Sequence, residues 1–168
     1  MERGKKTFLN FVMLSIIIPT LNEQENLPLL LKSIKKQEFN DYEIIVADAG
    51  SGDNTISIAK ENKCKIVKGG LPGKGRNAGA KVARGDMFLF LDADVVLRPD
   101  FISKALRETK KKKLDIATFP ILMIDTKLDK IVSHTYNFWA KLTERVLPHA
   151  PGCCILVKRK VHEAINGF

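Results

Sequence analysis

One stretch of the sequence joins an apolar strand to two closely spaced carboxylates. Residues 87–91 read Met87-Phe-Leu-Phe-Leu, a run typical of a buried β-strand, and Asp92 and Asp94 follow it directly. Side chains of an extended chain alternate between faces, so an extended conformation continued to residue 94 would bring both carboxylates to one spot. Neighbouring carboxylates repel unless a cation lies between them or one is protonated. The pattern favours a site for Mg²⁺ or Mn²⁺, with a polar turn after a core strand as the alternative.

The rest of the chain alternates between short apolar runs and segments with helical patterns. Strands are expected at residues 14–18, 43–47, 65–68, 87–91, 115–119 and 154–157, and helices at 22–34, 55–62, 78–83, 99–106, 129–146 and after 158. Such alternation is typical of an α/β fold with a mainly parallel sheet flanked by helices. At 168 residues the chain is expected to form a single domain, 1–168, with a basic, loosely ordered lead-in over 1–10.

Several helix boundaries depend on glycine and proline. Asn22 and Glu25 form a capping-box pattern, but Pro28 would then lie inside the helix, so the helix either kinks or begins near Pro28. The glycine-rich, basic residues 69–79 are expected to form a flexible loop, and Gly85 to end the helix that follows. In the helix expected over 129–146, the face that carries Phe138 and Trp139 fits a core-facing stripe better than a binding surface.

Charge and cysteine content narrow the partners and the setting. The net charge of +9 suits an anionic partner such as a nucleoside diphosphate or an acidic membrane surface, or serves solubility alone. Nucleic-acid binding is not predicted, because no recognition motif accompanies the charge. Cys64, Cys153 and Cys154 form no disulfide framework or metal motif, which favours a reducing, cytoplasmic setting. No apolar run reaches the length of a membrane span, so at most peripheral membrane association is expected.

Polar residues follow the first, second and fourth expected strands, where open α/β sheets bind nucleotides. A dinucleotide-binding fingerprint would place glycines after the first strand, but that turn reads Pro19-Thr-Leu-Asn-Glu. A P-loop that includes Gly73 and Lys74 would need glycine at position 68, which is Lys68, and Ser or Thr at position 75, which is Gly75. Both standard nucleotide-binding motifs are therefore excluded.

Four other motifs together resemble those of family 2 glycosyltransferases with the A-type (GT-A) fold. They read Ser15-Ile-Ile-Ile-Pro-Thr-Leu-Asn-Glu, Ile45-Val-Ala-Asp-Ala-Gly-Ser-Gly-Asp-Asn-Thr, Gly73-Lys-Gly-Arg-Asn-Ala-Gly and Leu89-Phe-Leu-Asp-Ala-Asp. They lie in the family's order between residues 14 and 98, and a weaker match covers 151–168. The resemblance implies a Rossmann-like nucleotide-diphospho-sugar transferase fold. It also implies transfer of a sugar from a nucleotide-diphosphate donor with inversion at the anomeric carbon.

The resemblance further implies roles for the residues that match these motifs. The donor would be bound by Pro19, Thr20, Asn22, Glu23, Asp48, Asp53, Lys74, Arg76 and Asp92. Among these, Asp48 would contact the base, Arg76 with Lys74 the base and diphosphate side, and Asp92 the ribose. Asp94, together with Asp92, would hold the metal as the family's Asp-x-Asp motif. The chemistry agrees, since a metal and nearby cations stabilise the charge of a departing nucleoside diphosphate.

The resemblance leaves the general base unassigned. The family's base follows a Gly-Phe pair near the acceptor, and this chain ends at Gly167-Phe168, so one interpretation is a chain truncated before its base. His162 and Glu163 are expected as surface residues of a short helix. None of the other candidates matches the position of the general base in the family's motif. These are His162 and Glu163, which lie close to Gly167 in the sequence, and the acidic residues Asp125 and Asp129.

Two alternatives to an active glycosyltransferase remain open. One is a catalytically silent nucleotide-sugar-binding module without a base. The other, a nucleotidyltransferase, is disfavoured because the glycine-rich signature expected after the first strand is absent. The acceptor is open between a polyprenyl phosphate, a glycan and a protein. The basic surface and the helix that carries Trp139 favour a lipid acceptor at the cytoplasmic membrane face.

Overall fold

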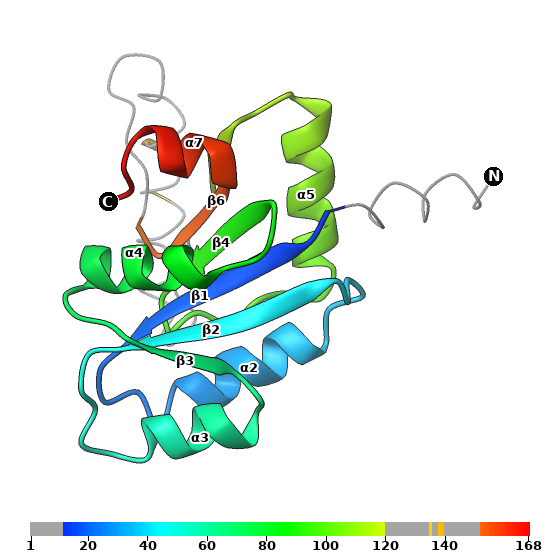
Figure 1. Cartoon of the computed structure of the whole chain (residues 1–168). Helices are drawn as coiled ribbons and strands as arrows, with labels where there is room; N and C mark the ends of the chain where they lie inside the picture. Colours follow the sequence, from blue (N-terminus) through cyan, green and yellow to red (C-terminus); the bar gives the residue numbers. More distant parts are fainter. Residues whose placement is uncertain (1–11, 120–134, 136–137, 140–151) are drawn as a thin grey trace.

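The computed structural model describes residues 12–119, 135, 138–139 and 152–168. Within them, six strands form one sheet in the order β3-β2-β1-β4-β6-β5 (Figure 1). The strands are β1 (Leu14–Thr20), β2 (Tyr42–Asp48), β3 (Lys65–Lys68), β4 (Met87–Leu91), β5 (Ile116–Thr118) and β6 (Cys154–Lys158). The helices are α2 (Leu27–Lys35), α3 (Thr55–Glu61), α4 (Pro72–Val82), α5 (Phe101–Lys111) and α7 (Arg159–Ala164).

The sheet is mainly parallel, as expected, but β6 runs against its neighbours. β1 pairs in parallel with β2 and β4, and β2 with β3, whereas β6 pairs antiparallel with both β4 and β5. Thr20 lies opposite Asp48, and Leu91 opposite Cys154. The ends of β1, β2 and β4 and the start of β6 therefore meet along one side of the sheet, here called the carboxyl edge; the opposite side is the amino edge.

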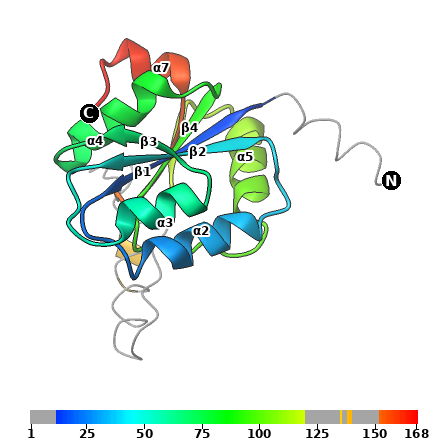
Figure 2. The same cartoon turned by 60° about the horizontal axis from the view of Figure 1, so that its bottom comes forward.

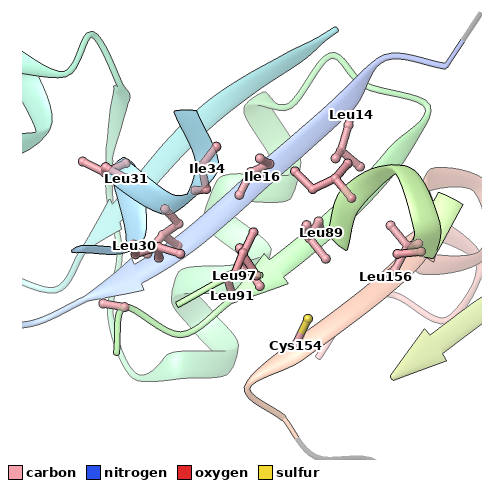
Figure 3. Packing of buried hydrophobic residues seen from close by; sticks show 14 of the residues in the cluster. Leu14, Ile16, Leu30, Leu31, Ile34, Leu89, Leu91, Leu97, Cys154 and Leu156 are labelled. Carbon is pink, nitrogen blue, oxygen red and sulfur yellow. The ribbon is translucent and has the colours of Figure 1, made fainter. Parts of the chain in front are cut away.

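Alternating residues of β1 pack into two separate cores. Leu14, Ile16 and Ile18 face α2, α3 and α5, and this cluster is drawn from close by in Figure 3. Ile17 faces the other way, toward α4 and a layer that contains Phe88 and Phe90 of β4. Figure 2 shows the resulting three layers, with α4 and α7 on one face of the sheet and α2 and α3 on the other. The expected α/β architecture is confirmed.

The first helix begins near the proline. α2 starts at Leu27 and carries Pro28 in its first turn, a position where the missing N–H costs nothing. The capping box expected at Asn22 and Glu25 is wrong, because Asn22 lies outside the helix and takes a left-handed φ of 56°. Its side chain instead bonds the loop after β2.

Residues 69–79 are largely helical, so the expected flexible loop is wrong. α4 begins at Pro72, and its glycines allow it to lie close to β1. A Cβ on Gly79 would overlap Ile17 Cγ2, and one on Gly75 would lie 3.2 Å from Pro19 Cβ. Gly85 is also not a helix-ending glycine, since α4 ends at Val82; a Cβ there would lie 2.6 Å from the backbone N of Ser15. Close approach to β1 explains these glycines.

Two expectations fall mostly outside the described residues. The lead-in over 1–10 lies outside them entirely, and the helix over 129–146 is described only at Thr135, Phe138 and Trp139, which are helical. The side chains of Phe138 and Trp139 are 65% and 57% exposed, so the expectation of a core-facing position is wrong for these two. None of the helices in the described parts of the chain combines the length and hydropathy that a membrane span requires.

Candidate functional site

A hydrogen-bond network joins the loops after β1 and β2 at the carboxyl edge. Thr20 Oγ1 donates to Asp48 Oδ1 at 3.2 Å, across the ends of the two strands. Farther out, Asn22 N donates to Ser51 Oγ at 2.9 Å, and Asn22 Oδ1 accepts the Gly52 N–H at 2.8 Å. Asparagine tolerates the left-handed conformation that this geometry requires. The network fixes the two loops relative to each other.

Asp48 is the centre of this network. Its Oδ2 accepts the backbone N–H groups of Gly50 and Ser51 at 2.8 and 2.9 Å, and its Oδ1 accepts the Ser51 hydroxyl at 2.5 Å. Burial by itself would raise the pKa of Asp48, but the hydrogen bonds from Ser51, Gly50 and Thr20 outweigh it and lower the pKa below 3.8. The charged carboxylate therefore organises the loop next to which the resemblance places the base of the donor.

Asp53 and Glu23 connect the same loops to α3. Asp53 Oδ2 accepts the Gln24 N–H at 3.0 Å, and its Oδ1 accepts the N–H of Thr55, the first residue of α3, at 3.0 Å. The Glu23 N–H donates to the Thr55 hydroxyl at 2.8 Å. The Glu23 carboxylate accepts from the side chain of Asn26 at 2.9 Å. Both acidic residues thus lie in the loops that follow β1 and β2, where Asp53 bonds the first loop and the start of α3.

Arg76 joins three segments that are far apart in the sequence. From the second turn of α4, its Nη2 donates to Asp92 Oδ1 at 2.7 Å and to the carbonyl oxygen of Gly152 at 3.0 Å. The Arg76 side chain is only 11% exposed, so this ion pair is better shielded from water than a surface pair. Its Nε is buried without a hydrogen-bond partner among the described residues. Among the described residues, the hydrogen bonds of Arg76 therefore run through Nη2, to Asp92 and Gly152.

The two aspartates of the Asp-x-Asp motif lie in a turn. β4 ends at Leu91, and Val95 N donates to the Asp92 carbonyl at 3.2 Å, so the extended conformation does not continue to residue 94. Ala93 is nevertheless buried between a half-buried Asp92 and an exposed Asp94. Both carboxylates thus remain at the surface of the carboxyl edge.

The donor atoms at this position suit a hard divalent cation. Carboxylate oxygens are the ligands that Mg²⁺ and Mn²⁺ prefer, and Mg²⁺ is commonly held by one or two carboxylates with substrate phosphates. Within the described residues no group of three or more His, Cys, Asp and Glu side chains could hold a metal by itself. Asp92 and Asp94 therefore fit a metal that arrives with a phosphorylated ligand better than a closed protein site.

Pro19 and Lys74 complete the set that the resemblance assigned. Pro19 lies beside Gly75 and so connects the end of β1 to the helix that carries Arg76. Lys74 is exposed at the start of α4, with its aliphatic stem beside Gly70. The structure thus forms two bonded groups, one around Asp48 and one around Arg76 and Asp92, and Lys74 belongs to neither.

Sequence reasoning missed several contributors to these groups. Ser51 and Thr55 supply hydroxyl partners, and Gly152 supplies a carbonyl to Arg76. Asn77 and Phe168, which lie inside the recognised motifs, pair with each other beside Arg76. The presence of Asn77 and Phe168 in those motifs could have marked them as candidates. Their contact with each other could not be predicted, because it depends on how the fold brings α4 and the residues after α7 together.

His162 and Glu163 occupy positions that do not suit a base. His162 is buried against Phe88 and Phe90, so its expectation as a surface residue is wrong. Glu163 is exposed and lies 3.6 Å from the Arg159 guanidinium. Asp125 and Asp129 lie outside the described residues.

Comparisons with known proteins agree with this geometry. The family model described as "Glycosyl transferase family 2" matches residues 15–165. The poly(ribitol-phosphate) beta-N-acetylglucosaminyltransferase TarS of Staphylococcus aureus is 32% identical over 123 residues, which make up 67% of this chain and 21% of TarS. The chain therefore spans about a fifth of the length of that relative.

Solved structures share the fold at lower identity. TarS residues 1–349 in complex with UDP-GlcNAc align with a TM-score of 0.67 and 22% identity over 92% of this chain and 47% of that one. The mannosyltransferase PcManGT from Pyrobaculum calidifontis, in complex with GDP-Man and Mn²⁺, aligns with a TM-score of 0.74 and 20% identity over 94% of this chain and 47% of that one. With the family model matched over nearly the whole sheet and its loops, the chain belongs to glycosyl transferase family 2 and has the GT-A fold of nucleotide-sugar transferases.

Proposed function

We propose that the chain forms the donor-binding domain of a metal-dependent, inverting glycosyltransferase. The observation that carries this proposal is the meeting of Asp92, Asp94 and Arg76 at the carboxyl edge, beside the loop organised by Asp48. Solved proteins of the same fold are complexed with UDP-GlcNAc or with GDP-Man and Mn²⁺, which supports a nucleotide sugar as the ligand class.

The two bonded groups would contact different parts of the donor. Pro19, Thr20, Asn22 and the Asp48 loop would border the nucleoside, because they are fixed to one another at the ends of β1 and β2. Arg76 would act on the diphosphate through its positive charge, and Lys74 would add an exposed ammonium group.

Asp94 and Asp92 would hold Mg²⁺ or Mn²⁺ against the diphosphate. When bound, such a metal would stabilise the negative charge that develops on the departing nucleoside diphosphate. Arg76 adds to that stabilisation from within a shielded ion pair, where electrostatic interactions are stronger than in water. We further propose that the acceptor is either a hydroxyl group of a glycan or the phosphate group of a polyprenyl phosphate. The lipid would be used at the cytoplasmic face of a membrane.

A catalytically silent nucleotide-sugar-binding module is the second candidate. Transfer with inversion needs a base on the face opposite the leaving group. His162 is buried among aromatic rings and Glu163 pairs with Arg159, so neither of these two is placed to accept the proton. Release of nucleoside diphosphate in the presence of acceptor would favour the enzyme, whereas donor binding without release would favour the module.

The decisive experiment is thermal stabilisation by UDP, GDP, UDP-GlcNAc and GDP-Man, each with Mn²⁺, with Mg²⁺ and with EDTA. A ligand at a hundred times its Kd should add about 2.7 kcal/mol to the free energy of unfolding, and only when metal is present. Asp94→Ala should lose most of that gain. If none of these nucleotides raises the melting temperature at about 1 mM, far above the Kd expected of a donor site, the proposal is wrong.

A further inference from the structure

The chain segment at Gly167 and Phe168 is fastened to α4 through both polar atoms of one side chain. Asn77 Nδ2 donates to the carbonyl oxygen of Phe168 at 2.9 Å, and Asn77 Oδ1 accepts the N–H of the same residue at 3.0 Å. Gly167 has a φ of +83°, and a Cβ there would overlap Asn77 Oδ1. The turn can therefore approach Asn77 this closely only with glycine at that position.

The ring of Phe168 is held against the core behind the candidate site. It packs edge-on against Phe90 with ring centroids 4.9 Å apart and against His162 at 5.8 Å. On another side, the Arg76 guanidinium carbon lies 5.3 Å from the centroid of the Phe168 ring. That separation is within the range in which a cation is attracted to an aromatic face.

These contacts restrict the side chain of Arg76, the residue that joins α4 to Asp92. Arginine has many rotamers, so confining its side chain costs conformational entropy that neighbouring contacts must offset. Nη2 is confined by Asp92 and Gly152, whereas Nε has no hydrogen-bond partner among the described residues. The Phe168 ring is a further neighbour of the guanidinium, beside the two hydrogen bonds that Nη2 makes.

We propose that Asn77 and Phe168 are positioning residues that hold the Arg76 guanidinium in place against Asp92. Asn77 fixes the Phe168 backbone, and the Phe168 ring limits the movement of the guanidinium. This inference rests on the proposed function in one respect, since it takes the Arg76 and Asp92 pair as part of the donor site. The pair is then presented to a diphosphate without first having to be ordered, which improves affinity for the donor.

The first test measures the mobility of Arg76 without any ligand. In ¹⁵N relaxation experiments the Arg76 Nε–H signal, assigned by its loss in Arg76→Lys, should report a rigid side chain in the unaltered protein. Asn77→Ala and Phe168→Leu should lower its order parameter below about 0.6, the range of flexible groups. Phe168→Tyr keeps the ring and should restore rigidity. Phe168 is 52% exposed, so these ring substitutions should leave the fold intact.

Asn62→Ala is the matched control for Asn77→Ala. Asn62 also makes two side-chain hydrogen bonds, to Lys35 Nζ and to the Ile58 carbonyl, but it lies at the far end of α3. A general loss of stability would affect both alanine variants equally, whereas a positioning role affects only Asn77. Unchanged mobility of Arg76 in Asn77→Ala and Phe168→Leu would overturn the proposal.

The second test measures the affinity for UDP and for GDP with Mn²⁺ by calorimetry. Asn77→Ala and Phe168→Leu should each raise the Kd about tenfold, and Asn62→Ala and Phe168→Tyr less than about twofold, as expected if donor binding must now also order the arginine. If Arg76 becomes mobile while the Kd is unchanged, the contacts serve stability alone and the positioning role is wrong. If the unaltered protein binds neither nucleotide, the proposed function fails, while the mobility measurement still decides whether the two residues hold Arg76.

Discussion

The two edges of the sheet use polar side chains differently. At the amino edge, Glu43 is half-buried and accepts from the Ser15 hydroxyl at 2.8 Å and from the Arg84 N–H and guanidinium at 2.5 and 3.2 Å. Lys65 Nζ donates to the carbonyl oxygen of Val82, the last residue of α4. A positive charge at this end of a helix also interacts favourably with the helix dipole. These polar groups are satisfied by one another and stabilise the fold.

At the carboxyl edge the inner polar groups are satisfied, while some of the outer ones are exposed. Asp48 and Asp53 are bonded to loop atoms, but Asp94 and Lys74 are exposed. An open hollow of about 530 Å³ lies at the amino edge, lined by Lys35, Tyr42, Glu43, Ile44, Asn62, Lys63, Lys65 and Arg84. The hollow thus lies at the opposite side of the sheet from the residues that we propose to bind the donor.

Asp94→Ala should give the largest effect on binding and none on stability. Loss of one of the two carboxylates that we propose to hold the metal should weaken metal-dependent nucleotide binding about a hundredfold, or about 2.7 kcal/mol. The free energy of unfolding without ligand should stay within about 0.5 kcal/mol, as for exposed residues in general. Calorimetric titration with nucleotide and Mn²⁺ checks this. Asp115→Ala, an exposed aspartate near the amino edge that pairs with Lys158, is the control and should bind normally; equal losses in both variants would contradict the comparison of the edges.

Glu43→Ala should give the reverse pattern. Removing this carboxylate leaves the Ser15 hydroxyl and the Arg84 groups without their partner, and should lower the free energy of unfolding by about 2 kcal/mol. Nucleotide affinity should not change, because the amino edge lies across the sheet from the candidate site. Urea denaturation measures the free energy of unfolding, and a separate calorimetric titration measures the nucleotide affinity. A loss of affinity as large as that of Asp94→Ala would refute the division of roles between the edges.

Asp48→Asn should affect both properties, since Asp48 organises a loop that we propose to border the nucleoside. An amide in place of one acceptor oxygen should cost about 1–2 kcal/mol of stability and raise the nucleotide Kd about tenfold. The pKa of Asp48 is lowered in the folded state, so its contribution is present above about pH 3.8 and is lost as the pH falls through the folded-state pKa. Urea unfolding from pH 7 to pH 3 should show the stability difference between the two proteins shrinking at acid pH. A difference that stays constant would mean that the carboxylate charge is not what the loop requires.

His162 should give the smallest effect, visible only as a dependence on pH. Burial lowers the pKa of His162 from its ordinary 6.5, and the neighbouring Glu163 opposes that shift only in part. Below about pH 6.5 the unfolded chain therefore binds the proton more readily, so stability should fall as the pH decreases until the folded-state pKa is reached. His162→Phe should remove this part of the dependence. Denaturation at pH 7.5 and pH 5.5 compares the two proteins, and identical pH profiles would contradict the prediction.

The strands and the polar loops after them could be predicted because their signals are local. The run at residues 14–18 is mainly apolar and stops at Pro19, and the run at 87–91 stops at Asp92. Once the two strands are parallel, the loops that follow them must lie on the same side of the sheet. The four motifs and their order along the chain were sufficient to identify the family, and the family model that matches residues 15–165 confirms this identification.

The parts that could not be predicted depend on contacts between distant residues. Glycine disfavours helix in isolation, but in α4 the close packing of Gly79 on Ile17 overrides that preference. Apolar patterning does not encode strand direction, so the reversal of β6 was not foreseen. The bond from Arg76 to Gly152 spans 76 positions of the sequence and requires that reversal, because it brings the start of β6 to the carboxyl edge.

The pairing of β5 with β6 has a consequence for redesign of the protein. Thr118 and Ile155 are registered opposite each other on adjacent strands, so the chain leaves the sheet at β5 and re-enters it beside the same point, at the carboxyl edge. The cost of closing a loop rises by only about 0.6 kcal/mol for each doubling of its length. The number of residues between Thr118 and Ile155 therefore adds little to the cost of bringing these two strands into register, so the pairing of β5 with β6 should tolerate a change in that number.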